Sequence, residues 1–145
     1  MDSILNQTAV IIAIACAGLF FMTALITGCW KFYCMLHSEQ FQAPYYVDIA
    51  HRASLLYSFA AILIAVFAFF SPFAVWVSVI ATIAPLLFFA IAIFHYIKLG
   101  IHNTTDNQLR DSEDPGADKI IMLSLMTAEI GGFLVLLIGF FIQVF

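Results

Sequence analysis

Three ionisable side chains, Asp48, His51 and Arg52, stand at the start of a long apolar stretch of the sequence. Charged residues within a membrane segment usually face a bundle interior or a watery cavity, unless the side chain can reach the interface. At helical spacing the three share one face, and Asp48 and Arg52 stand at positions i and i+4, where an ion pair can form. Two interpretations remain open: an interfacial salt bridge that anchors the helix, or a polar pocket in which Arg52 holds an anionic group and His51 transfers a proton.

Glu129 is the second unusual residue, because it lies well inside the last apolar stretch. At ~1.5 Å per helical residue it is ~15 Å deep, close to the middle of a ~30 Å hydrocarbon core. A carboxyl group at that depth is protonated, is paired with a basic group from another helix, or lines a wet cavity. The small residues Gly131 and Gly132 nearby permit close helix contact, so structural and functional interpretations are both open.

The composition defines the class of protein that must position these residues. Of 145 residues, 64% are hydrophobic and 10% are charged, and 16 are Phe. A soluble domain is nearer half apolar and a quarter charged, so this chain is predicted to be an integral membrane protein with a single domain. The net charge of −4 argues against nucleic acid as a partner.

Hydropathy predicts an all-α, four-helix bundle whose spans cover about 8–30, 45–70, 74–97 and 119–145. The segment 32–44 is expected to be a polar connection, with Pro44 at the start of the second helix. Only Ser71, Pro72 and Phe73 separate the second and third spans, which predicts an antiparallel hairpin. Pro85 lies within the third span and leaves one carbonyl to be satisfied by a neighbour.

The basic residues predict the orientation of the chain in the membrane. All five lie on or beside the two long connections, and none is in the termini or the 71–73 turn. They are Lys31, Arg52, Lys98, Arg110 and Lys119. By the positive-inside rule, we expect both connections to be cytoplasmic and both termini to be outside, and we expect the membrane to be a bacterial inner membrane.

Metal and disulfide chemistry receive little support from the sequence. Cys16, Cys29 and Cys34 form neither a CxxC motif nor an even framework, and no pattern of a zinc site is present. His51 and His95 could serve as axial ligands of a haem, but interfacial histidines are more often hydrogen-bonding residues.

The order of these features resembles the superfamily of membrane-associated proteins in eicosanoid and glutathione metabolism (MAPEG). His51 matches the histidine at the start of the family's second span, although Ala53 and Leu56 stand where the family carries Asn and Glu. His95 and Tyr96 are similar to the end of its third span, where the usual preceding arginine is absent. Met122 and Thr127 match positions in its last span.

The resemblance implies a homotrimer that binds glutathione and a lipophilic substrate between subunits, on the cytoplasmic side. It implies a glutathione transferase-like or isomerase-like reaction, with Arg52 replacing the family's lost basic contacts and activating the thiolate. We therefore expect catalytic roles for two residues and substrate-binding roles for six. The catalytic residues are Arg52 and His51, and the substrate-binding residues are Asp48, Tyr45, Ser58, His95, Tyr96 and Glu129.

Two other classes of function remain open. The chain is small, rich in Phe and without a soluble domain, which suits a non-catalytic subunit or scaffold of a larger membrane complex. A proton-coupled carrier that uses Glu129 is the third possibility, although four spans offer little pathway without oligomerisation. Membrane lipids are expected neighbours in every case.

Overall fold

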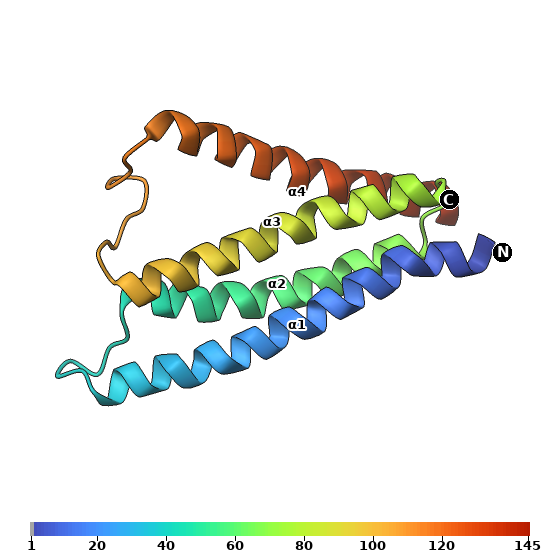
Figure 1. Ribbon diagram of the computed structural model, residues 1–145. Helices are drawn as coiled ribbons and strands as arrows, with labels where there is room; N and C mark the ends of the chain where they lie inside the picture. The colour runs from blue at the N-terminus through green and yellow to red at the C-terminus, as the bar shows by residue number, and fades with distance from the viewer. Residues whose placement is uncertain (1) are drawn as a thin grey trace.

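The computed structural model describes the backbone from Asp2 to Phe145 and the side chains from Thr8 onward. Four helices account for most of it, and each is long and apolar enough to cross a membrane. In Figure 1 they are α1 (Asp2–Leu36), α2 (Tyr45–Phe69), α3 (Val75–His102) and α4 (Pro115–Val144). The prediction of an all-α protein with four membrane-length helices is confirmed, and the arrangement is compatible with a four-helix bundle.

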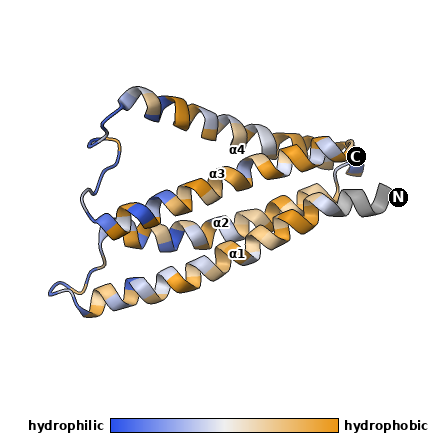
Figure 2. Ribbon diagram, in the orientation of Figure 1, coloured by the Kyte–Doolittle hydropathy of each residue, from blue (hydrophilic) through white to orange (hydrophobic). Residues whose placement is uncertain are grey.

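The two long connections lie at one end of the molecule, and the short 71–73 turn lies at the other end with both chain termini (Figure 1). Hydrophilic residues concentrate on the connections and the adjoining helix ends, whereas the helices are apolar over most of their length (Figure 2). This pattern agrees with a bundle that crosses the membrane along the helix axes. The cytoplasmic location of the connections stays a prediction.

Four helix boundaries differ from the sequence-based prediction, and one is the start of α1, at Asp2 and not at about residue 8. α1 continues to Leu36, well into the expected connection, because Phe32, Tyr33 and Leu36 are compatible with the helix and no Gly or Pro interrupts it. α3 continues to His102 and ends where Asn103 adopts a left-handed conformation, with φ 47° and ψ 40°. α4 begins earlier than expected, at Pro115.

Two caps explain where α4 and α2 begin. The Asp114 side chain accepts hydrogen bonds from the backbone N–H groups of Gly116 and Ala117, each at 3.0 Å. Pro44 immediately precedes α2, rather than forming part of its first turn, and its carbonyl accepts from Val47 and Asp48. Asp114 therefore caps the start of α4 with its side chain, and Pro44 caps the start of α2 with its backbone carbonyl.

The contact between α1 and α2 is made by small side chains. The alanine and serine side chains on the facing sides are almost fully buried. Because these side chains are small, the two helix backbones can approach closely. On α1 these residues are Ala9, Ala13, Ala17 and Ala24, and on α2 they are Ala50, Ser54, Ser58, Ala61, Ala65 and Ala68. Gly100 of α3 packs closely against both helices, because a Cβ there would lie 3.0 Å from Trp30 of α1 and 3.2 Å from Val47 of α2.

The contact between α3 and α4 lies in the half of α4 that approaches the termini. Pro85 has no N–H to donate to the Ala81 carbonyl, and Gly132 of α4 packs directly against that oxygen and the proline ring. Gly139 packs in the same way against Pro72 and Phe73 of the short turn. The carbonyl that Pro85 leaves without its helical donor is thus covered by a neighbouring helix.

The first half of α4 leaves the other helices. In Figure 1, α4 diverges from α3 toward the second long connection. The buried residues of α4 are Gly132, Leu136 and Gly139, all in its second half, and α1 makes no contact with α4 within the described chain. The molecule is therefore open on one side at the end that carries the long connections.

Candidate functional site

The carboxylate of Asp48 pairs more closely with a residue of α1 than with its helical neighbour. Lys31 Nζ lies 2.6 Å from Asp48 Oδ1, whereas Arg52 Nη1 lies 3.4 Å from Asp48 Oδ2. The predicted Asp48–Arg52 pair is present, but the Arg52 side chain is 68% exposed. The Lys31–Asp48 pair ties α1 to α2 near the first connection, which supports the anchoring interpretation of this cluster.

His51 connects the same two helices at a greater depth. Its Nδ1 lies 2.9 Å from the Ala24 carbonyl oxygen of α1. Because a carbonyl oxygen only accepts, Nδ1 carries the hydrogen, and Nε2 is the ring nitrogen that remains available in the neutral form. The imidazole packs against Gly28, where a Cβ would lie 3.0 Å from Cε1. The local geometry thus gives His51 a structural partner and leaves one nitrogen for chemistry.

A second group of polar residues joins α2, α3 and the second connection. The Tyr46 and Tyr96 rings are stacked, with centroids 6.1 Å apart, and the Tyr46 hydroxyl accepts a hydrogen bond from the backbone N–H of Gln108 at 2.8 Å. Gln108 Oε1 is buried and has no hydrogen-bond partner among the described residues. Tyr46 therefore holds the connection against the ends of the helices.

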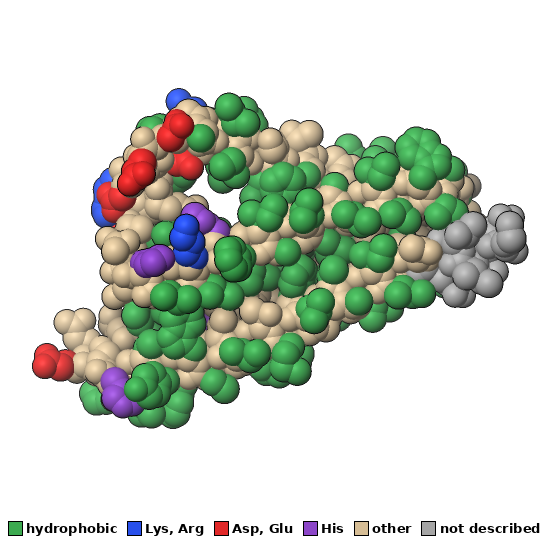
Figure 3. Space-filling model, viewed as in Figure 1, with side chains coloured by type: hydrophobic (Ala, Val, Ile, Leu, Met, Phe, Trp, Pro, Cys, Tyr) green, Lys and Arg blue, Asp and Glu red, His purple; other side chains and the backbone are tan. Residues whose placement is uncertain are grey.

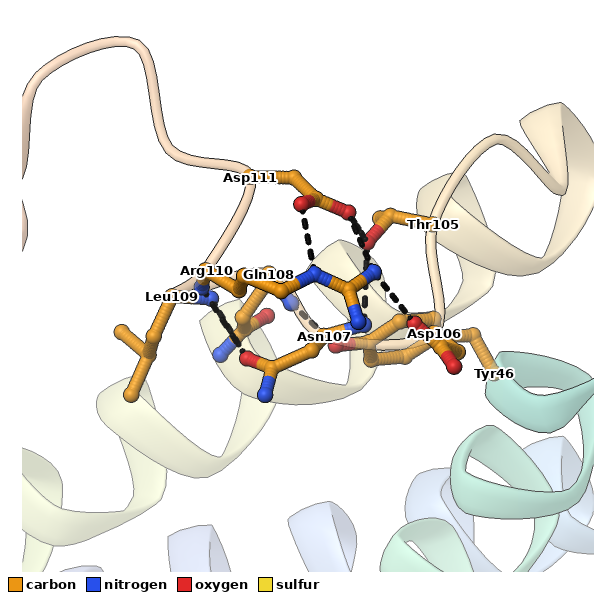
Figure 4. Close-up of polar contacts among 8 residues, drawn as sticks. All are labelled: Tyr46, Thr105, Asp106, Asn107, Gln108, Leu109, Arg110 and Asp111. Atoms are coloured by element: carbon orange, nitrogen blue, oxygen red, sulfur yellow. Dashed lines mark hydrogen bonds and ion pairs between the residues drawn. The ribbon is translucent and has the colours of Figure 1, made fainter.

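Within the second connection, charged side chains form a network of ion pairs and hydrogen bonds, which Figure 4 shows. Arg110 donates to Asp111 at 2.8 Å and to Asp106 at 2.6 Å, and the Thr105 hydroxyl donates to Asp111. The Arg110 guanidinium, followed by the Thr105 hydroxyl, lowers the pKa of Asp111 to about 2. Hydrogen bonds from Arg110 to Asp111 and then Asp106 raise the pKa of the guanidinium above its ordinary value. The Arg110 guanidinium is thereby paired with carboxylates of its own connection.

Glu129 lies where α4 begins to diverge. Fourteen residues of α4 precede it and fifteen follow it, so it is at the middle of the helix, one turn before the close contact at Gly132. Its Oε1 atom is buried and has no hydrogen-bond partner among the described residues. The phenol groups of Tyr57 on α2 and Tyr96 on α3 lie within electrostatic range of its carboxyl group.

Between Glu129 and the second connection, the protein is hollowed. Figure 3 shows an opening bordered by the first half of α4 and by the connection with its acidic side chains, with His and Lys or Arg side chains along the other edge. A cavity of about 540 Å³ lies along the first half of α4. It is lined by Leu109, Pro115, Asp118, Lys119, Met122, Leu123 and Met126.

The lining of this cavity changes character along α4. Asp118 and Lys119 are polar and lie near the connection, whereas Met122, Leu123 and Met126 are apolar and lie deeper. Glu129 follows Met122 and Met126 at helical spacing, and Cα–Cβ bonds tilt toward the helix N-terminus, so its side chain leans toward the cavity. The opening therefore has a polar mouth and an apolar wall, and Glu129 lies about one helical turn beyond Met126, its innermost lining residue on α4.

The structure places the predicted site residues in separate groups. Asp48, His51 and Arg52 lie at the contact of α1 with α2, and Tyr96 and Glu129 lie on the side of α4. Of the other three, His95 lies beside Tyr96 with ring centroids 6.4 Å apart, and Tyr45 packs edge-on against Tyr46. Tyr45 and His95 are exposed, and Ser58 is buried with its hydroxyl donating to the Leu55 carbonyl at 2.6 Å.

Sequence reasoning missed three participants. Lys31 is the closest partner of Asp48, but it lies on another helix. The sequence indicated only that Lys31 stands at the end of a span. Tyr57 stacks on Phe89 with ring centroids 4.2 Å apart, and its phenol group lies within electrostatic range of Glu129. Met122 was indicated only by the resemblance and Met126 by nothing in the sequence, because the divergence of α4 is what makes these side chains line a cavity.

Metal ligation has no geometric support in the part of the chain that the structure describes. No three His, Cys, Asp or Glu side chains there are grouped so as to hold a metal ion. Cys16, Cys29 and Cys34 are free thiols.

Comparison with models of known protein families gives no match, and searches of curated proteins and of solved structures find no similar protein. The class that the fold defines is a protein with four membrane-length helices. The resemblance to the MAPEG superfamily stays a prediction.

Proposed function

We propose that the protein binds an amphipathic or lipophilic molecule within the membrane, in the hollow between α3 and the first half of α4. The observation that carries this proposal is the cavity of about 540 Å³, with Asp118 and Lys119 at its mouth and Met122, Leu123 and Met126 along its wall. The volume is within the range of ~300–1,000 Å³ typical of ligand sites, and the polarity gradient matches a molecule with a polar end and an apolar body.

Two further features support the proposal. The hollow opens to the side of the bundle, so a membrane-dissolved molecule reaches it without crossing water. Methionine side chains are unbranched and polarizable, and they adapt to ligands of different shapes. Met122 is 39% exposed and Met126 is 48% exposed, so both are accessible to such a ligand.

The resemblance to the MAPEG superfamily gives this proposal its catalytic form. In that form the protein is a homotrimer in the bacterial inner membrane, and glutathione reacts with the lipophilic molecule near Arg52 and His51, between neighbouring subunits. The exposure of the Arg52 side chain supports this form, because its guanidinium is free to contact an anionic group. Calorimetry with glutathione tests it. Absence of binding, with R52A equal to wild type in thiol transfer, would overturn the catalytic form alone.

The binding proposal is tested with dodecanol that carries a photoreactive diazirine. After irradiation of the protein in lipid nanodiscs, mass spectrometry locates the adducts. We expect adducts at residues that line the cavity, and we expect Met126→Trp to reduce them because the larger side chain fills the space. Ile130→Trp is the matched control, since Ile130 is on the same helix and 64% exposed. Adducts spread evenly over all lipid-facing residues would contradict the proposal.

The same opening supports a second candidate, a non-catalytic subunit of a larger membrane complex. None of the residues 115–128 of α4 is buried, and a helix of another protein could occupy the space beside them. The discriminating observation is the behaviour during purification. A protein that is stable alone as a defined oligomer favours the ligand-binding function, whereas dependence on a co-purified partner favours the subunit.

A further inference from the structure

Glu129 forms no ion pair with the described residues of the chain. Within the described residues, the ion pairs of Lys31 and Arg52 are with Asp48, and those of Arg110 are with Asp106 and Asp111. Lys119 is ten residues away on the same helix, about 15 Å along the axis, beyond the reach of its side chain. A carboxyl group with a buried, unpartnered oxygen in the middle of a membrane helix is costly unless something supplies the missing interaction.

The groups around Glu129 suit a cation. Tyr57 and Tyr96 contribute phenol oxygens that can accept hydrogen bonds and ring faces that attract positive charge. Both rings are held in place, because Tyr57 stacks on Phe89 with an interplanar angle of 8° and Tyr96 stacks on Tyr46 with an angle of 20°. Their positions therefore do not depend on a ligand.

The position of Glu129 also determines how a ligand would reach it. The residue lies beyond the apolar wall of Met122 and Met126 and just before the contact of Gly132 with Ala81 and Pro85, where α3 and α4 meet. Only a lipophilic molecule passes along that wall into the membrane interior. A carboxylate and an ammonium ion together carry no net charge, which makes their shared burial less costly than that of either alone.

We propose that Glu129 binds the ammonium group of a lipophilic amine at the inner limit of the hollow. This inference rests on the proposed function, since it names the class of molecule that enters the same cavity. The amine is bound as its protonated form against the Glu129 carboxylate, with its hydrocarbon part along the methionines of α4.

The test is a competition against the photoreactive dodecanol in nanodiscs, with dodecylamine, dodecanol and dodecanoate as competitors of equal chain length. In the wild type, we expect dodecylamine to suppress the adducts at a concentration at least about tenfold lower than the other two, because a desolvated charge pair is lost without the ammonium. Glu129→Gln should abolish this preference for dodecylamine. Glu129→Asp should retain part of it.

Glu113→Gln is the matched control, because it removes an exposed carboxylate of the second connection and should leave the preference intact. Circular dichroism and size-exclusion chromatography of each variant establish that it folds. Adducts in the cavity with equal competition by all three molecules would overturn the assignment of Glu129 and leave the proposed function standing. Preference for the amine that survives in Glu129→Gln would do the same. Absence of cavity adducts with both the dodecanol and a photoreactive dodecylamine would overturn both proposals.

Discussion

Gly132 of α4 lies directly against the carbonyl oxygen of Ala81 on α3, where a Cβ atom would come within 2.6 Å of that oxygen. The Ala81 carbonyl is the one that would accept from residue 85, and Pro85 has no N–H to donate. The absence of a side chain at position 132 thus lets α4 cover the carbonyl. This contact also marks the point from which the two helices diverge toward the second connection.

Substitution of this glycine should weaken the contact between α3 and α4. We expect Gly132→Ala to lower the free energy of unfolding in micelles by about 1–3 kcal/mol, as other overpacked contacts do. Gly131→Ala is the control, because a Cβ at Gly131 would have no atom within 4 Å. Chemical unfolding followed by circular dichroism measures both. Helix propensity alone would make both substitutions neutral or stabilising, because Ala is a better helix former than Gly, so equal effects of the two would show that the contact is not responsible.

The partners of Asp48 make unequal contributions to stability. Lys31 is closer than Arg52 and less exposed, so its positive charge is more strongly coupled to the carboxylate. We expect Lys31→Ala to be more destabilising than Arg52→Ala, with a coupling energy to Asp48 of roughly 0.2–1 kcal/mol in a double-mutant cycle. A larger coupling for Arg52 than for Lys31 would contradict the geometry.

The contact of His51 with Gly28 predicts a compensating pair of substitutions. Gly28→Ala places a methyl group 3.0 Å from the imidazole and should disturb its hydrogen bond to Ala24. We expect Gly28→Ala and His51→Ala each to cost about 0.6–1.7 kcal/mol, in the range of interhelical hydrogen bonds in membranes. The double variant should be less destabilised than the sum of the two. Unfolding measurements on all four proteins check this, and simple additivity would refute it.

The charge network of the second connection should weaken in acid. The pKa of Asp111 falls from 3.8 to about 2 in the folded connection, so the fold favours the ionised form. Its stabilising effect is therefore fully present above pH 3.8 and is lost as the pH falls through about 2. An NMR titration of the Asp111 carboxyl carbon measures this midpoint.

Arg110→Gln should move the same titration upward, toward the ordinary value of 3.8, because it removes the main cause of the shift. Lys119→Gln is the control, since Lys119 forms no ion pair with the described residues of this network. An unchanged midpoint in Arg110→Gln would show that the network is not formed in solution.

The sequence by itself determined the four membrane-length helices, the short 71–73 turn and the gathering of charges at the connections. Runs of apolar residues and the positions of Pro and Gly are local properties, and the cost of exposing backbone polar groups to lipid leaves the helix as the available structure. The sequence also indicated Glu129 as unusual, because depth along a span can be counted from residue numbers. Helix ends were less predictable, as the extension of α1 to Leu36 shows.

The tertiary structure alone decided which side chains meet. Asp48 could pair with Arg52 by spacing, but the packing of α1 on α2 brings Lys31 nearer, and the same packing gives His51 the Ala24 carbonyl. Tyr57 lies within electrostatic range of Glu129 because of the way α2, α3 and α4 pack against one another. Rotation and register follow from close contacts such as Gly132 with Ala81, and residue spacing within one helix contains no information about them.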